Sequence, residues 1–210
     1  MYDQLEAENY YHIYNRGNNK EDLFVEAANY NFFLKKYATY CYPVLDTYAY
    51  CLLKNHFHLV ARVRSQKEFE TLLQKGNRID RKTRDRLNKK DWSSSLVSQQ
   101  LSHMFNGYTQ AFNKKYNRTG ALFQRPFQRK RIDADSYFCN VISYIHRNPQ
   151  LHRFVEDFRS YPYSSYLIYV SGKNSRLNVR ETLDWFGGRE NFIASHEMEL
   201  HKIIGEFVIE

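Results

Sequence analysis

Two histidines, His56 and His58, flank Phe57 in the apolar run LLKNHFHLV (52–60). Successive residues of a β-strand project from opposite faces, so both imidazoles would share one face and Phe57 would lie on the other. Imidazole nitrogens are good ligands for divalent metal ions. The pattern therefore fits a pair of metal ligands, although two incidental polar residues on a half-buried strand would look the same.

A second group of polar side chains lies in DADSYFCNVISYIHRNP (133–149), whose spacing predicts a helix that ends at Pro149. Tyr144 and Asn148 are one turn apart and project from the same side of this helix. The amide oxygen could complete a site for Mg²⁺ or Mn²⁺ that leaves positions open for phosphate oxygens. A tyrosine beside such an ion is a candidate nucleophile. Tyr137 is its rival on the same stripe, but the residue one turn after it is not an amide.

Hydrophobic periodicity predicts the elements that would position these groups. We expect strands at 9–15, 44–53 and 56–63, helices at 25–41, 93–117 and 133–149, and a basic loop leading into a short strand at 118–132. Lys54 and Asn55 would join the two middle strands as a hairpin. A helix between strands and an antiparallel hairpin predict an α+β sandwich, with helices packed on one face of an antiparallel sheet.

The composition is basic and rich in aromatic residues. The 210 residues include 31 Lys and Arg against 23 Asp and Glu, and 17% are aromatic. Positive charge attracts phosphate backbones and aromatic rings stack on unpaired bases, so single-stranded nucleic acid is a candidate partner, although many basic proteins bind none. No apolar run approaches the roughly 20 residues that cross a bilayer. The absence of a secretory signal pattern and three scattered cysteines predict a cytoplasmic protein with free thiols.

Basic residues are concentrated between positions 114 and 131, where no acidic residue occurs. They could line a groove that contacts phosphates, or form a solvated face. Asn15 and Arg16, at the end of the first predicted strand, could contact DNA or cap a turn. The candidate DNA-binding residues are Asn15, Arg16, Lys114, Lys115, Arg118, Arg125, Arg129, Lys130 and Arg131.

Five segments, taken together, resemble a known family. They are HIYNRGNNKEDLF (12–24), YAYCLLKNHFHLVAR (48–62), YTQAFNKKYNRTGALFQRPFQ (108–128), YFCNVISYIHRNP (137–149) and YPYSSY (161–166). In this order they resemble the HUH single-tyrosine transposases, and more narrowly the REP-associated tyrosine transposases. The resemblance covers roughly residues 9–170.

The resemblance implies a ferredoxin-like α/β sandwich with a central antiparallel sheet, the HUH endonuclease fold. It implies that His56 and His58 are ligands of a divalent metal, Mg²⁺ or Mn²⁺, that Asn148 is the third ligand, and that Tyr144 is the catalytic tyrosine. The family cleaves and joins single-stranded DNA at sites set by hairpins or palindromic repeats, through a 5′-phosphotyrosine intermediate. Its members work as monomers or homodimers.

Other interpretations of the sequence stay open. The chain could be a DNA-hairpin-binding module of the same fold that has lost cleavage, or a replication initiator or relaxase of the wider HUH superfamily, although these usually carry larger attached domains. We expect a transposase domain at 1–170, in which 64–92 is an inserted charged segment, followed by a helical tail at 171–210. The inserted segment and the tail are the parts least similar to the family.

Overall fold

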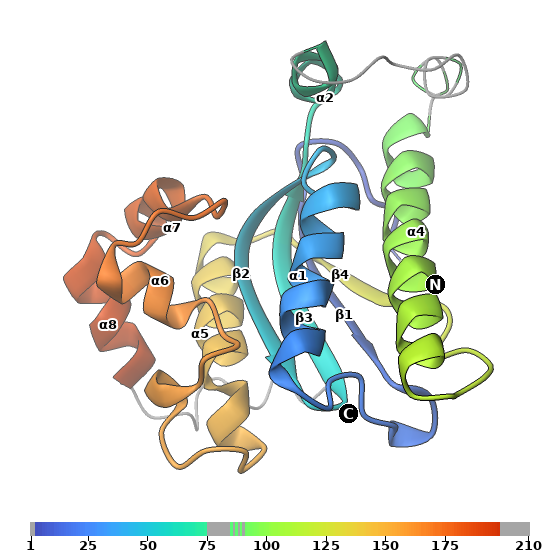
Figure 1. Cartoon of the computed structure of the whole chain (residues 1–210). Helices are drawn as coiled ribbons and strands as arrows, with labels where there is room; N and C mark the ends of the chain where they lie inside the picture. Colours follow the sequence, from blue (N-terminus) through green and yellow to red (C-terminus); the bar gives the residue numbers. More distant parts are fainter. Residues whose placement is uncertain (1–2, 75–84, 86, 88, 90, 198–210) are drawn as a thin grey trace.

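The computed structural model describes residues 3–74, 85, 87, 89 and 91–197. At the centre of this part of the chain lies a four-stranded sheet in the order β2-β3-β1-β4 (Figure 1). Its strands are β1 (Tyr10–Arg16), β2 (Leu45–Leu53), β3 (His56–Val63) and β4 (Gln128–Ile132). Every neighbouring pair is antiparallel, so the predicted antiparallel sheet is confirmed.

Strands β2 and β3 form the predicted hairpin around Lys54 and Asn55. On its other side β3 pairs with β1, so that Arg16 lies opposite His56 and Tyr14 lies opposite His58. Partners directly opposite each other share a face of the sheet. The register therefore surrounds both histidines with β1 side chains from far away in the sequence.

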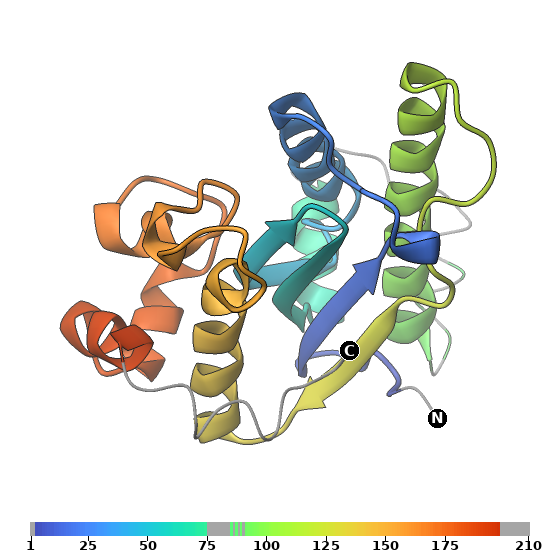
Figure 2. The same cartoon turned by 90° about the horizontal axis from the view of Figure 1, so that it is seen from below.

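Helices α1 (Ala27–Tyr40) and α4 (Trp92–Lys115) cover one face of the sheet (Figure 2). Their apolar residues recur at helical spacing and pack against the strands. The core on this face includes Phe33, Phe57, Leu101, Met104, Phe105 and Tyr108. A β-α-β-β-α-β order with both helices on one face is the ferredoxin-like arrangement, which confirms the α+β fold class.

The opposite face is covered by α5 (Asp135–Leu151), beside which lie α6 (Tyr166–Ser171), α7 (Val179–Trp185) and α8 (Arg189–Glu197) (Figure 2). The expectation that helices would pack on one face only is therefore wrong. Strands β2 and β3 are buried along nearly their whole length, so both of their faces need cover. The second core includes Tyr48, Val60, Phe138, Ile142, Ile145, Tyr169 and Phe192.

Helix α5 continues past Pro149 to Leu151, so the expectation that this proline ends the helix is wrong. A proline inside a helix loses one hydrogen bond and clashes with the preceding turn, which costs about 3 kcal/mol. Here every residue from 141 to 149 is buried, and tertiary packing holds the helix in place. The amide of Phe154 then donates to the Pro149 carbonyl (2.8 Å) and closes the end of the helix.

The charged segment 64–92 contains α2 (Gln66–Gln74). Arg62 of β3 pairs with Glu68 of α2 at 2.7 Å and with Asp46 of β2 at 2.5 Å, which ties α2 to the end of the sheet. Residues 75–84, 86, 88 and 90 of this segment and residues 198–210 of the tail lie outside the described residues. The division into a domain, an insertion and a tail therefore stays a prediction.

Two short 3-10 helices, η1 (Asn18–Lys20) and η2 (Phe158–Ser160), lie in connecting segments. The three cysteines are free thiols, as predicted. Among the helices that the structure describes, none combines the length and the apolar character needed to cross a bilayer.

Candidate functional site

The HxH pair, His56 and His58, lies on the face of β3 that α5 covers, with ring centroids 5.2 Å apart. Burial lowers the pKa of His56 to about 3. The pKa of His58, whose side chain is 4% exposed, is also held well below its ordinary value by burial. Both rings are therefore neutral at pH 7 and carry the lone pair that metal ligation requires.

Each ring of the HxH pair is held by a second side chain through Nδ1. His56 Nδ1 lies 2.7 Å from Asn55 Oδ1, and His58 Nδ1 lies 2.9 Å from His12 Nε2. An amide oxygen only accepts, so His56 carries its proton on Nδ1 and its lone pair on Nε2. In the matching tautomer, His58 donates its Nδ1–H to His12. Proteins orient histidines that ligate metals through Nε2 by this kind of contact.

His12 and Tyr14 of β1 belong to the same cluster, and sequence reasoning missed both. His12 is fully buried, and burial, aided by the charge of Lys130, lowers its pKa to about 3. Tyr14 stacks on His58 with ring centroids 5.7 Å apart. Alternation along β1 was the available signal, but it places these side chains beside His58 only when the pairing of β1 with β3 is known.

Tyr144 and Asn148 of α5 and His152, the residue that caps its C-terminal end, follow one another at four-residue spacing and form one stripe. Tyr144 lies edge-on to His58, with centroids 6.0 Å apart, and His152 lies edge-on to His56 at 5.0 Å. Asn148 is fully buried, and helical spacing places it between Tyr144 and His152 on the same stripe. The structure therefore brings Tyr144 to the HxH pair, on the helical stripe that also carries Asn148. It adds His152, which the sequence analysis did not include among the site residues.

The two polar atoms of the buried Asn148 differ in their contacts. Its Nδ2 donates to the Tyr144 carbonyl at 3.1 Å, whereas Oδ1 has no hydrogen-bond partner within the described part of the chain. A buried acceptor without a partner costs about 1–3 kcal/mol. This orphaned oxygen, on the helical stripe whose neighbours contact two neutral imidazoles, fits a divalent ion, for which amide oxygen and imidazole nitrogen are suitable donors.

The amide oxygen is the third member of this candidate donor set. In the described ranges, no group of three or more His, Cys, Asp or Glu side chains is arranged to hold a metal ion. The amide of Asn148 is not one of these four residue types, so this observation does not bear on a site that includes it. The candidate donor set for a metal is therefore two imidazoles and one carboxamide, those of His56, His58 and Asn148.

The candidate DNA-binding residues separate onto the two faces of the sheet. Arg16 lies on the side of the HxH pair, where its charge contributes to the low pKa of His56. Lys130 lies on the same side of β4, with Nζ 4.9 Å from the ring of Tyr137. Asn15 and Arg129 alternate with them along β1 and β4 and therefore face α4.

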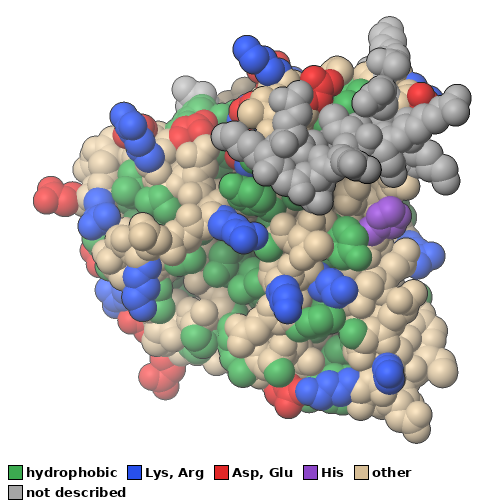
Figure 3. Space-filling view, turned by 45° about the horizontal axis from the view of Figure 1, so that its top comes forward, with side chains coloured by type: hydrophobic (Ala, Val, Ile, Leu, Met, Phe, Trp, Pro, Cys, Tyr) green, Lys and Arg blue, Asp and Glu red, His purple; other side chains and the backbone are tan. Residues whose placement is uncertain are grey.

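Several of the other candidate cations are engaged within the chain. Lys114 is exposed, and Arg125 donates to Asn106 at 3.2 Å. On the face shown in Figure 3, Lys and Arg side chains are dispersed rather than gathered in one continuous patch. The ion pairs with acidic residues from elsewhere in the chain are Lys115 with Glu26, Arg118 with Glu21, and Arg131 with Glu6. These pairs favour a structural role for the three cations.

A buried chain of hydrogen bonds fixes α5 behind the site. His146 Nδ1 lies 2.8 Å from Nε2 of His196 in α8, and His146 Nε2 lies 2.7 Å from Ser165 Oγ. The same Ser165 oxygen accepts from the backbone N–H of Tyr50 in β2 at 2.9 Å. His146 and His196 are thus structural residues that tie the tyrosine helix to the sheet and to α8.

Comparisons with known proteins agree with the fold and with the resemblance of the motifs. No family model matches the chain. A Haemophilus influenzae protein that is named as a REP-associated tyrosine transposase is 28% identical over 141 residues, which cover 65% of this chain and 68% of that protein. A solved structure of a REP-associated tyrosine transposase bound to a REP hairpin matches with a TM-score of 0.57 and 13% identity, over 84% of this chain and 88% of that chain; this match shows a shared fold. The resemblance indicated by the sequence motifs is thereby confirmed: this chain is similar to the REP-associated tyrosine transposases of the HUH single-tyrosine family.

Proposed function

We propose that this protein nicks and rejoins single-stranded, hairpin-flanked DNA with Tyr144 as the nucleophile and with a divalent metal, Mg²⁺ or Mn²⁺. The observation that carries the proposal is the packing of the Tyr144–Asn148 stripe against two neutral histidines that are each held through Nδ1. The substrate class is supported by the similar transposase that is bound to a REP hairpin.

His56 and His58 would hold the ion through Nε2, and Asn148 would hold it through Oδ1. A metal bound there supplies Lewis-acid polarisation of a phosphodiester. The Tyr144 hydroxyl loses its proton and attacks phosphorus, so that the bond from its oxygen to phosphorus forms while the bond from phosphorus to the 3′ oxygen breaks. The 3′ oxygen takes up a proton, and the 5′-phosphate stays on the tyrosine. The reverse reaction with a 3′-hydroxyl from another strand rejoins the DNA without hydrolysis.

Other residues of the chain prepare this chemistry. The side chain of Tyr144 is 7% exposed, which limits the access of water that would compete with strand joining. Arg16 lies opposite His56 and supplies positive charge where a phosphate would bind. His12 orients His58 through the contact between their ring nitrogens.

The test is the covalent adduct. Labelled single-stranded hairpin DNA is incubated with the protein and Mn²⁺ and analysed on a denaturing protein gel. We expect an adduct with the wild type and with the control Tyr137→Phe, and none with Tyr144→Phe, which should bind the hairpin as well as the wild type does. An equal amount of adduct with Tyr144→Phe would refute the assignment.

The same assay distinguishes the proposed enzyme from a module that binds DNA hairpins without cleaving them. That alternative requires that the wild type forms no adduct on any hairpin, while its hairpin affinity is insensitive to chelator and to His56→Ala. A cytoplasmic location and a monomeric or homodimeric state stay predictions that go with the proposed function.

A further inference from the structure

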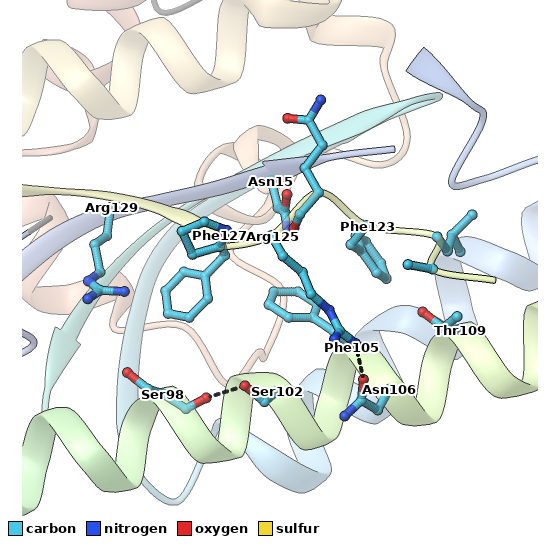
Figure 4. A pocket seen from close by; sticks show the side chains of 14 residues that line it. Asn15, Ser98, Ser102, Phe105, Asn106, Thr109, Phe123, Arg125, Phe127 and Arg129 are labelled. Atoms are coloured by element: carbon cyan, nitrogen blue, oxygen red, sulfur yellow. Dashed lines mark hydrogen bonds between the residues drawn. The ribbon is translucent and has the colours of Figure 1, made fainter. Parts of the chain in front are cut away.

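A cavity lies on the opposite face of the sheet from the HxH pair, between α4 and residues 121–129 (Figure 4). Its volume is about 540 Å³, which lies within the range of small-molecule sites in proteins. None of the residues discussed so far as metal ligands or nucleophile lines it. It is therefore a separate candidate site.

The walls of this cavity combine aromatic rings with a polar stripe. Phe105 lies beside Phe123 and Phe127, with ring centroids 4.9 and 6.0 Å apart. Facing Phe123 and Phe127, α4 presents Phe105 together with hydroxyl and amide groups at helical spacing (Figure 4). The polar residues of the stripe are Ser98, Ser102, Asn106 and Thr109. Rings that stack and side groups that hydrogen-bond at the edges suit a flat heteroaromatic molecule such as a nucleobase.

The charge around the cavity suits an anion attached to that flat molecule. Arg125 reaches from the loop to α4, where it donates to the neutral Asn106 amide, and it makes no ion pair with any residue that the structure describes (Figure 4). The guanidinium of Arg129 lies 5.0 Å from the ring centroid of Phe127. No acidic side chain is found among the described residues that line the cavity. Arg129 Nε also donates to the Asp3 carbonyl at 2.6 Å, and its positive charge is still available to an anion. A base with its phosphates matches the rings and the two positive charges.

The cavity and the HxH pair share one end of β1. Asn15 lines the cavity, whereas its neighbour Arg16 lies opposite His56 on the other face. The loop that carries Arg125 is fixed to this strand end, because Gln124 N donates to the Arg16 carbonyl (2.9 Å) and Asn15 Nδ2 donates to the Gln124 carbonyl (3.1 Å). A nucleic acid strand at the HxH pair therefore has the cavity directly across the sheet.

Edge strand β4 offers a route between the two faces. Lys130 lies on the side of the HxH pair, and Arg129 lies on the side of the cavity. Cations that alternate along the edge β-strand can contact successive phosphates of a single-stranded DNA that bends around the edge of the sheet. We propose that the cavity binds one unpaired base of the single-stranded DNA whose backbone occupies the HxH site, with adjacent phosphates on Arg125 and Arg129. This inference rests on the proposed function for its substrate class and adds a site that reads the strand beside the cleavage point.

The first test changes the DNA and leaves the residues of the cavity unaltered. Tyr144→Phe, in chelator, is titrated with hairpin oligonucleotides that carry single-stranded flanks, and each flanking nucleotide is replaced in turn by an abasic site. We expect one position at which base removal weakens binding by about tenfold, because stacking of one base contributes on this scale. Abasic sites elsewhere in the flank should have much smaller effects.

A matched pair of variants then locates that base. Ser102→Trp fills the cavity from an exposed position of α4, and Gln110→Trp adds the same side chain to the same helix outside the cavity. We expect Ser102→Trp to bind the intact oligonucleotide about tenfold more weakly and to lose the abasic effect, and Gln110→Trp to behave as the parent protein. Unfolding curves confirm that both variants fold.

Three outcomes would overturn the inference: an abasic scan without a sensitive position, an abasic effect that persists in folded Ser102→Trp, or no binding of any single strand. The proposed function is tested separately by the adduct that the wild type forms with Mn²⁺. An adduct with a flat abasic scan refutes the cavity alone, whereas a sensitive position without any adduct refutes the cleavage alone.

Discussion

Replacing Asn148 by Leu tests the proposed metal site through stability as well as activity. In the metal-free protein, loss of the orphaned Oδ1 relieves about 1–3 kcal/mol, whereas loss of the Nδ2 contact with the Tyr144 carbonyl gives up about 0.5–1.5 kcal/mol. Leu has a similar size and fills the same buried space. We expect the free energy of unfolding without metal to be nearly unchanged or to rise by up to about 2 kcal/mol.

Metal should reverse the order of the two proteins. A ligand that binds only the folded state stabilises it by about 2.7 kcal/mol when its concentration is 100 times its Kd. Residues that only orient a metal ligand change metal affinity by about 10–100-fold when they are replaced, and we take the upper value, about 100-fold, for loss of the amide oxygen itself. The same metal concentration then stabilises Asn148→Leu by only about 0.4 kcal/mol. The wild type should therefore become the more strongly stabilised protein in Mn²⁺.

Urea unfolding in chelator and in Mn²⁺ measures both effects. Asn29→Leu is the matched control, because Asn29 is also buried but its Oδ1 accepts from the amides of Val25 (2.9 Å) and Glu26 (3.1 Å). This control should lose a few kcal/mol without metal and keep the full metal-dependent gain. A full metal-dependent gain in Asn148→Leu, or a loss beyond about 2 kcal/mol without metal, would refute the assignment of Oδ1 as a ligand.

Three further perturbations test the contacts around the site. His12→Leu should weaken Mn²⁺ binding about 10–100-fold in calorimetric titrations, because His58 loses its Nδ1 partner; unchanged affinity would show that His12 does not orient it. Ser165→Ala should lower the free energy of unfolding by about 1–3 kcal/mol in urea, since His146 Nε2 loses its buried partner, and equal stability would contradict this contact. Burial lowers the pKa of His196 to about 4. Below pH 6.5 the unfolded chain therefore binds a proton at this residue that the folded chain excludes, so the free energy of unfolding decreases as the pH is lowered. Through this residue the free energy of unfolding of the wild type should decrease by about 2 kcal/mol from about pH 7 to pH 5. Urea unfolding at both pH values should show a decrease for His196→Gln that is smaller by this amount.

Local geometry explains which parts of the site the sequence could predict. Alternation along a strand is a property of the backbone, so it was enough to place His56 and His58 on one face. Helical spacing was enough to place Tyr144 and Asn148 on one side of α5. The end of that helix was predicted wrongly at Pro149, because local preference is overridden where the surrounding residues are buried.

The roles of the basic residues depended on contacts that no local pattern contains. A run of cations without acidic neighbours suggested one groove between positions 114 and 131. In the fold, three of them meet acidic residues from the N-terminal part of the chain. Others separate onto the two faces of β4, where alternation directs Lys130 toward the HxH pair and Arg129 toward the cavity.

The sequence alone determined the strand that carries the HxH pair, the helix that carries Tyr144 and Asn148, and the family that the chain resembles. All of these depend on neighbouring residues in one element or on motifs read in order. Only the tertiary structure decided that His12 lies against His58, that His152 reaches His56, and that a cavity opens behind the site. The physical reason is that strand register and helix packing join segments that are separated by tens of residues. These arrangements are stabilised by surface that is buried between segments, which the sequence of one segment does not specify.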